Sequence, residues 1–184
     1  MTSSATDIIY KFVLISAALV FMYVTTNQVL SGKLNLSPNG LGRFNNLTTF
    51  PDKLQFTLVH LSWPVLLLQV QVLLTIFKRL STMAIDPSAE NDKHVFRANS
   101  ILRNYVEQFI LSAFSQLIVI SHLSAKQTLQ FIPLMNLFFV VGRVTFYLGY
   151  PKSRSFGFLC CMVPTLSALV VSAYEFLAFV ELVR

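Results

Sequence analysis

The stretch RANSILRNYVEQFILSAFSQLIVI, residues 97–120, decides how this 184-residue chain is interpreted. Its second half, residues 109–120, is mostly apolar and typical of a membrane helix. Its first half places an amide, Asn104, and a carboxylate, Glu107, one helical turn apart on one face. Ionisable groups at membrane depth are rare and usually have a partner or a function. The stretch therefore predicts a functional site at the mouth of a membrane helix.

The composition also indicates a membrane protein. The chain is 54% hydrophobic and 12% charged, whereas soluble domains are about a quarter charged. Its net charge of +6 comes from residues in loops and at helix ends, which suits anionic headgroups better than nucleic acid. No P-loop, GxSxG or HExxH pattern occurs in the sequence. His60 has no His/Cys cluster near it in the sequence, so no metal site is predicted.

Five apolar runs are long enough to cross a hydrocarbon core of about 30 Å. They are residues 8–30, 54–77, 101–123, 129–149 and 156–180. None alternates like a strand, so the sequence predicts an all-α polytopic bundle of five transmembrane helices. We divide it into an amino-terminal anchor helix with a lumenal loop, residues 1–53, and a four-helix membrane domain, residues 54–184. The short connections between the last three runs predict antiparallel hairpins.

The distribution of basic residues predicts an orientation. Eight lie on one side of the predicted bundle: Lys11, Lys78, Arg79, Lys93, Arg97, Arg103, Lys152 and Arg154. Five lie on the other: Lys33, Arg43, Lys53, Lys126 and Arg184. Because cytosolic loops are enriched in Lys and Arg, we expect a cytosolic amino terminus and a lumenal or extracellular carboxyl terminus. The glycosylation sequon at Asn46 then falls on the lumenal side.

Polar side chains from several runs reach the predicted cytosolic interface. They are Lys78, Arg79, Asn104, Glu107, Arg143, Tyr150 and Arg154. Together they form a cradle suited to a zwitterionic or polyanionic small molecule, because arginine binds carboxylates in bidentate fashion. A guanidinium beside a thiol would also favour the reactive thiolate. Two alternatives stay open: a structural Glu107–Arg143 ion pair, or a lipid bound in the same cradle.

Two groups of residues resemble the landmarks of a known superfamily. The first is Arg97-Ala98-Asn99 followed by Asn104 and Glu107, and the second is Arg143, Phe146, Gly149 and Tyr150 with Arg154 behind them. In this order and spacing they resemble MAPEG, the membrane-associated proteins in eicosanoid and glutathione metabolism. The resemblance covers roughly residue 54 to the carboxyl end.

The resemblance implies a homotrimer of four-helix protomers that binds glutathione between subunits, near the cytosolic side. Asn104 and Glu107 match the residues that hold the glutathione backbone, and Arg143 and Tyr150 match further contacts. Arg154 matches the catalytic arginine that stabilises the thiolate, and Lys78 or Arg79 matches the basic end of the family's first helix.

The sequence departs from the MAPEG pattern at two positions and has one additional helix, and these differences determine which function we expect. Ser100 stands where the family has a clamp arginine, and Phe146 stands where it has a tyrosine. The extra amino-terminal helix is similar to the transmembrane protein 79 (mattrin) branch, which is associated with Frizzled turnover in Wnt signalling.

We therefore expect an integral protein of the endoplasmic reticulum, another endomembrane or the plasma membrane, with a degenerate glutathione site. It would act through protein contacts on a membrane-receptor partner. The alternative is a glutathione-dependent transferase, peroxidase or isomerase with a lipophilic substrate, and the sequence leaves open whether the chain is an enzyme.

Overall fold

The computed structural model describes residues 5–36, 47–82 and 92–182. This part of the chain contains five α-helices and no strand. They are α1 (Ala5–Leu30), α2 (Phe50–Ser81), α3 (Asp92–Val119), α4 (Ala125–Gly149) and α5 (Ser155–Leu182). The predicted all-α class is confirmed. The sequon at Asn46 lies outside the described residues, and the orientation in the membrane stays a prediction.

Four of the helices, α1, α2, α4 and α5, are long and apolar enough to cross a membrane. The fifth, α3, has 28 residues but a polar amino-terminal half. It begins at Asp92, nine residues before the predicted run at 101. The predicted start was late because hydropathy detects only the apolar part of a helix. The polar turns before residue 101 are also helical, since water or neighbouring helices can bond to their polar side chains.

Local signals in the sequence explain where two helices begin. Thr49 caps α2 in a reciprocal capping box with Asp52. Ser124 caps α4 in the same way with Gln127. Each box satisfies backbone N–H groups that the first turn of a helix leaves without partners. The two helices therefore start at fixed points, and the connection from α3 to α4 is only five residues long.

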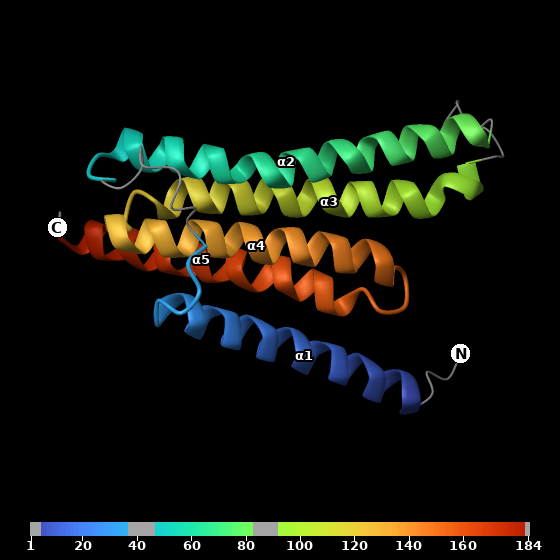
Figure 1. The fold of residues 1–184 in the computed structure, drawn as a ribbon, viewed down its shortest axis with the longest axis horizontal. Coiled ribbons are helices and arrows are strands. Elements are labelled where there is room, and N and C mark those ends of the chain that lie inside the picture. The colour runs from blue at the N-terminus through green and yellow to red at the C-terminus, as the bar shows by residue number, and fades with distance from the viewer. Residues whose placement is uncertain (1–4, 37–46, 83–91, 183–184) are drawn as a thin grey trace.

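The helices run along one long axis (Figure 1). α2 lies against α3, α4 against α5, and α1 packs across α5 and α4 at one side of the bundle. The carboxyl end of α2, the amino end of α3 and the α4–α5 turn lie at the same end, together with the start of α1. We call this the 150–154 end, after the α4–α5 turn.

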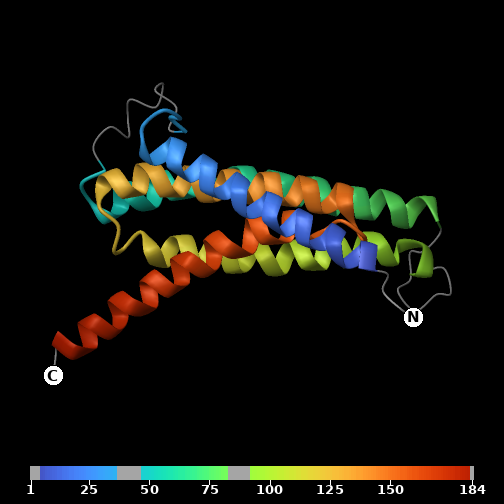
Figure 2. The same ribbon diagram turned by 90° about the horizontal axis from the view of Figure 1, so that it is seen from below.

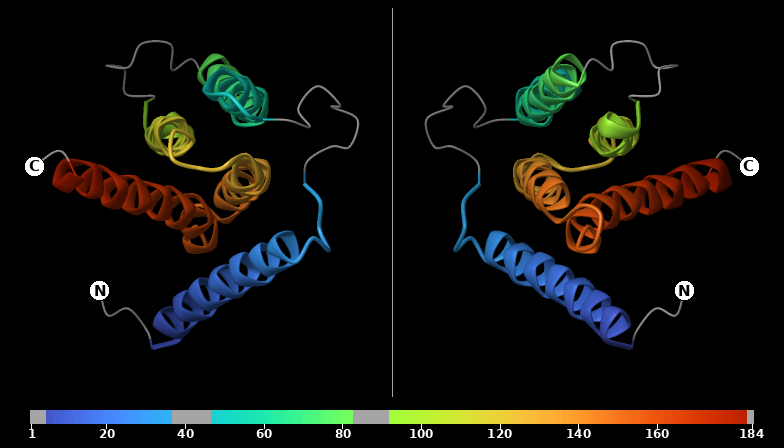
Figure 3. Two further views of the ribbon diagram at one scale, coloured as in Figure 1. Left: turned by 90° about the vertical axis from the view of Figure 1, so that its left-hand side faces the viewer. Right: turned by 90° about the vertical axis from the view of Figure 1, so that its right-hand side faces the viewer.

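The far end of α5 leaves the bundle. Figure 2 shows its carboxyl-terminal part diverging from the other helices, and the end-on views of Figure 3 show the same. Residues 173–181 are all exposed in the single chain. Prolines lie inside α2, α4 and α5, at Pro64, Pro133 and Pro164. Membrane helices tolerate proline because neighbouring groups can satisfy the backbone carbonyls that it leaves without a donor.

Two glycines allow α4 and α5 to approach closely. A Cβ on Gly157 would collide with the backbone oxygen of Gly142 and lie 2.5 Å from the backbone nitrogen of Phe146. A Cβ on Gly142 would lie 2.6 Å from Cys161 Sγ. Small residues at such crossings let helix backbones meet, which is a common way to pack helices within membranes. This crossing holds the α4–α5 hairpin together at the 150–154 end.

We expect Gly157→Ala to destabilise the bundle by about 1–3 kcal/mol, because the added methyl group must displace backbone rather than a movable side chain. The measurement is equilibrium unfolding of the purified protein in detergent micelles. Gly149→Ala is the matched control, since its Cβ comes closest to the movable Ser153 hydroxyl. Equal stability of the two variants would contradict the close approach.

Candidate functional site

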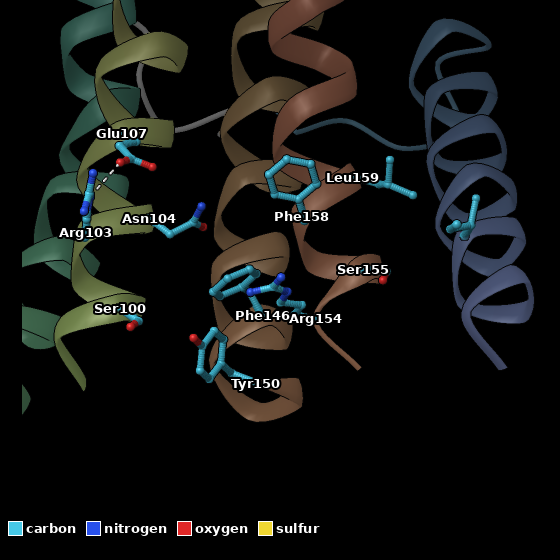
Figure 4. Close-up of a pocket in the computed structure, with 11 residues that line it drawn as sticks. Ser100, Arg103, Asn104, Glu107, Phe146, Tyr150, Arg154, Ser155, Phe158 and Leu159 are labelled. Carbon is cyan, nitrogen blue, oxygen red and sulfur yellow. Dashed lines mark hydrogen bonds and ion pairs between the residues drawn. The ribbon is translucent and has the colours of Figure 1, made fainter. Parts of the chain in front are cut away.

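A cleft of about 590 Å³ opens among α3, α4 and α5 at the 150–154 end. Figure 4 shows side chains from α3 facing those from the end of α4 and the start of α5. The lining residues are Ile15, Ser100, Arg103, Asn104, Glu107, Phe146, Tyr150, Arg154, Ser155, Phe158 and Leu159. Polar groups from α3 and from the α4–α5 turn thus face one another across the cleft, and apolar residues from α1, α4 and α5 complete its wall.

The α3 wall presents a row of four polar side chains. Ser100, Arg103, Asn104 and Glu107 recur at spacings of three and four residues, which places them on one helix face. Arg103 Nε donates to Glu107 Oε1 at 3.1 Å. The two side chains are 84% and 53% exposed. An exposed pair of this kind contributes only about 0.2–1 kcal/mol, so a ligand can compete for both charges.

The opposite wall carries a phenol and a second guanidinium. Tyr150 follows the last residue of α4, and Arg154 precedes the first residue of α5. The Arg154 Cζ atom lies 5.6 Å from the centroid of the Tyr150 ring, in a cation–π contact. Phe146 packs against Tyr150, with ring centroids 5.7 Å apart and ring planes tilted by 46°. The α4–α5 turn thereby aims a cation across the cleft at α3.

Arg143 lies behind the cleft rather than in it. Its side chain is only 4% exposed. Its Nη1 donates to Asn104 Oδ1 at 3.0 Å, and its Nε donates to Cys161 Sγ at 3.2 Å. Its Cζ lies 4.8 Å from the centroid of the Phe146 ring. The predicted cradle residue therefore supports the cleft through Asn104 and does not line it.

The alternative interpretation as a Glu107–Arg143 ion pair is wrong. Glu107 pairs with Arg103 on its own helix, and Arg143 bonds to the neutral Asn104. Both side chains line the cleft (Figure 4), but only Asn104 lies close enough to α4 to accept a hydrogen bond from Arg143. Asn104 thus bonds to a neighbouring helix, whereas Glu107 bonds within its own helix.

Arg79 lies away from the cleft. Its Nη2 donates to Asn99 Oδ1 at 3.2 Å, which joins the end of α2 to α3. Of the six predicted site residues, the structure brings Asn104, Glu107, Tyr150 and Arg154 into one cleft, with Arg143 directly behind it.

Sequence reasoning left Arg103 out of the predicted site. Its spacing from Ser100 and Glu107 could have placed it on the same face. The two cysteines, Cys160 and Cys161, are fully buried, so they act as small packing residues, and Cys161 also accepts the bond from Arg143.

These features define a class: a polytopic helical membrane protein with a polar cleft at one end of its bundle. The MAPEG family model matches residues 57–174, which run from α2 into α5. The chain therefore belongs to the MAPEG family, as the two landmarks predicted. α1 lies outside the matched residues. No curated protein and no solved structure matches the chain.

We expect Asn104→Leu to lower the stability of the protein by about 1–3 kcal/mol, because it leaves a further nitrogen of the buried Arg143 without a partner. Asn104→Asp should instead raise the thermal unfolding temperature, since it gives the guanidinium a counter-charge. Arg103→Gln, which breaks only the exposed pair, is the control and should change stability by less than about 1 kcal/mol. A larger loss in Arg103→Gln than in Asn104→Leu would contradict this assignment.

Proposed function

We propose that the chain is a membrane regulator of the mattrin-like type whose cleft binds glutathione without turning it over efficiently. The observation that carries the proposal is the cleft itself. Side chains from both sequence landmarks, Asn104 and Glu107 on one side and Tyr150 and Arg154 on the other, face one space of about 590 Å³. Ligand pockets in proteins commonly range from about 300 to 1,000 Å³.

The chemistry of the cleft fits glutathione. The peptide carries two carboxylates and one ammonium group, and the cleft offers two guanidiniums, Arg103 and Arg154, and one carboxylate, Glu107. Charge-assisted hydrogen bonds of this kind are the strongest available to a small polar ligand. The Asn104 oxygen is bonded to Arg143, so its amide nitrogen remains to donate to a peptide carbonyl. Bound glutathione would supply a thiol nucleophile to the cleft.

Ser100 favours a regulator over an enzyme. It lines the cleft at the position where the MAPEG resemblance places the clamp arginine. A hydroxyl cannot neutralise a carboxylate, and both cations that remain are exposed, so water weakens their field. The site would hold glutathione loosely and would stabilise a thiolate poorly.

Two surfaces support action through protein contacts. α1 is an additional helix packed on α5 and α4, outside the family match. The exposed end of α5, residues 173–181, carries large apolar side chains and is available to other chains in the bilayer. We propose that these surfaces serve assembly into a homotrimer and contact with a membrane receptor of the Frizzled kind.

The second candidate function is a glutathione-dependent transferase, peroxidase or isomerase. One observation favours it: the Arg154 guanidinium lies in the cleft beside the Tyr150 ring, where both groups could face a bound thiol. Two variants distinguish the regulator from the enzyme: Ser100→Arg, which adds a cation to the cleft, and Arg154→Ala, which removes one.

We expect Glu107→Gln to weaken glutathione binding about tenfold or more, because the ammonium group loses its charged partner. Ser100→Arg should strengthen binding by a similar factor, since it returns a cation to the cleft. Isothermal titration calorimetry of the purified protein in micelles measures both. Lys126→Gln, at the opposite end of α4, is the control and should bind like the wild type. Binding that Glu107→Gln leaves unchanged would disprove the assignment of the cleft.

We expect the wild-type protein to conjugate glutathione to 1-chloro-2,4-dinitrobenzene no faster than the uncatalysed reaction, and to show no ultraviolet thiolate absorbance. Arg154→Ala should accordingly leave the effect of the protein on Frizzled abundance in cells unchanged, provided that the variant still assembles. Efficient conjugation that is lost in Arg154→Ala would establish the enzyme instead.

A further inference from the structure

The bundle buries a positive charge that its neighbouring side chains do not neutralise. Arg143 is 4% exposed, and in the described part of the chain its hydrogen-bond partners, Asn104 and Cys161, are both neutral. Its Nη2 atom is buried and has no partner among the described residues. Three aromatic rings lie around the guanidinium, but they offset its charge only in part. A buried cation without a counter-charge is strongly disfavoured, so we expect an anion beside it.

A second buried donor lies at the same place. Gln71 on α2 is 5% exposed, and its Nε2 atom also lacks a partner within the residues that the structure describes. Gln71 and Arg143 both line a cavity of about 160 Å³ among α2, α3 and α4. This cavity shares only Phe146 with the cleft described above. Buried polar groups are normally bonded, so two unpaired donors at one cavity indicate an acceptor that the chain does not supply.

The wall of the cavity determines which anion it can hold. Apart from the two donors, the wall consists of apolar and aromatic side chains. Such a wall solvates charge poorly, and Arg143 offers one positive charge, so a divalent anion would stay uncompensated. The cost of removing an ion from water falls as its radius rises, which favours large monovalent ions. A chloride ion is slightly larger than a water molecule, whose share of liquid volume is about 30 Å³, so the cavity can hold the ion together with a few waters.

The cavity lies near the basic end of the bundle. Arg143 lies six residues before the end of α4, which is about 9 Å at 1.5 Å per residue. Leu148, in the last turn of α4, forms part of the wall. Lys78 and Arg79 lie in the last turn of α2, beyond Gln71. Cations around an entrance raise the local concentration of anions, so an ion from the aqueous phase has a short and favourable path from the 150–154 end.

We propose that this cavity is a chloride site. Arg143 Nη2 and Gln71 Nε2 donate to the ion, which supplies the counter-charge that the guanidinium lacks. Val70 and Val144 also line the cavity and are exposed on the outer surface, where lipid tails would cover them. The ion thereby becomes part of the packing of α2 and α3 against α4. The site is separate from the glutathione cleft and does not rest on the function proposed for it.

The test uses the purified full chain in detergent micelles. Its thermal unfolding is compared in sodium chloride and in sodium gluconate of equal concentration. We expect chloride to raise the unfolding temperature in a saturable manner, because a ligand that binds only the folded state stabilises it. The line width of the chlorine NMR signal measures binding directly. The protein should broaden this signal, and bromide should reverse the broadening at a lower concentration than sulfate, since a divalent ion exceeds the one available charge.

Two variants locate the ion. Gln71→Leu should weaken chloride binding about tenfold, because it removes one of the two donors. Gln69→Leu is the matched control, the same change at an exposed position of the same helix, and should bind like the wild type. Asn104→Asp gives Arg143 a counter-charge within the protein, so its unfolding temperature should no longer depend on chloride.

The variants also separate this site from the cleft. Gln71→Leu removes an unpaired buried amide, so its stability in gluconate should equal or exceed that of the wild type. Its affinity for glutathione in gluconate should be unaltered.

Three results would each overturn the proposal. A chlorine signal that the protein does not broaden would show that the cavity holds no chloride. A chloride effect that persists unchanged in Gln71→Leu or in Asn104→Asp would place the ion elsewhere. Sulfate that competes better than bromide would assign the binding to exposed basic side chains.

Discussion

The buried guanidinium of Arg143 joins three of the helices, and the rest of the site depends on it. It belongs to α4, and it bonds to Asn104 on α3 and to Cys161 on α5. Tyr105, whose ring lies 5.5 Å from the same guanidinium, extends the connection to α2 by donating to the Pro64 carbonyl at 2.8 Å. A buried cation tolerates little displacement of its partners, because every lost bond leaves charge unsolvated. The relative rotation of α3 and α4, and hence the shape of the cleft, follows from this constraint.

The close approach of α4 and α5 makes that constraint possible. Gly142 and Gly157 let the two backbones meet, and the same approach brings Cys161 within reach of the guanidinium. Nearer the opposite end of the bundle, Asn136 donates to Gln116 at 2.7 Å and ties α4 to α3. Polar bonds thus fix the helices at two levels along the axis. In a membrane the apolar faces contribute little to helix–helix specificity, because lipid tails solvate them equally well. Specificity then rests on these few polar and small residues.

The number and order of the helices were predictable from the sequence, whereas their rotation about their own axes was not. The apolar runs were enough to expect five helices, and the two spaced motifs were enough to expect Asn104, Glu107, Tyr150 and Arg154 at one end of the bundle. Hydropathy carries no information about which face of a helix meets which neighbour when nearly every position is apolar. For that reason the inward turn of Arg143 and the position of Arg79 away from the cleft appeared only in three dimensions.

The neutral residue at position 104 serves both the buried guanidinium and the cleft. Its amide accepts from Arg143 through its oxygen, and the same side chain lines the cleft. A carboxylate at this position would cancel the charge of Arg143, but it would offer no donor to a ligand in the cleft. An amide supplies an acceptor for the guanidinium and keeps a donor for the cleft, so one side chain links the packing of α3 against α4 to the chemistry of the site.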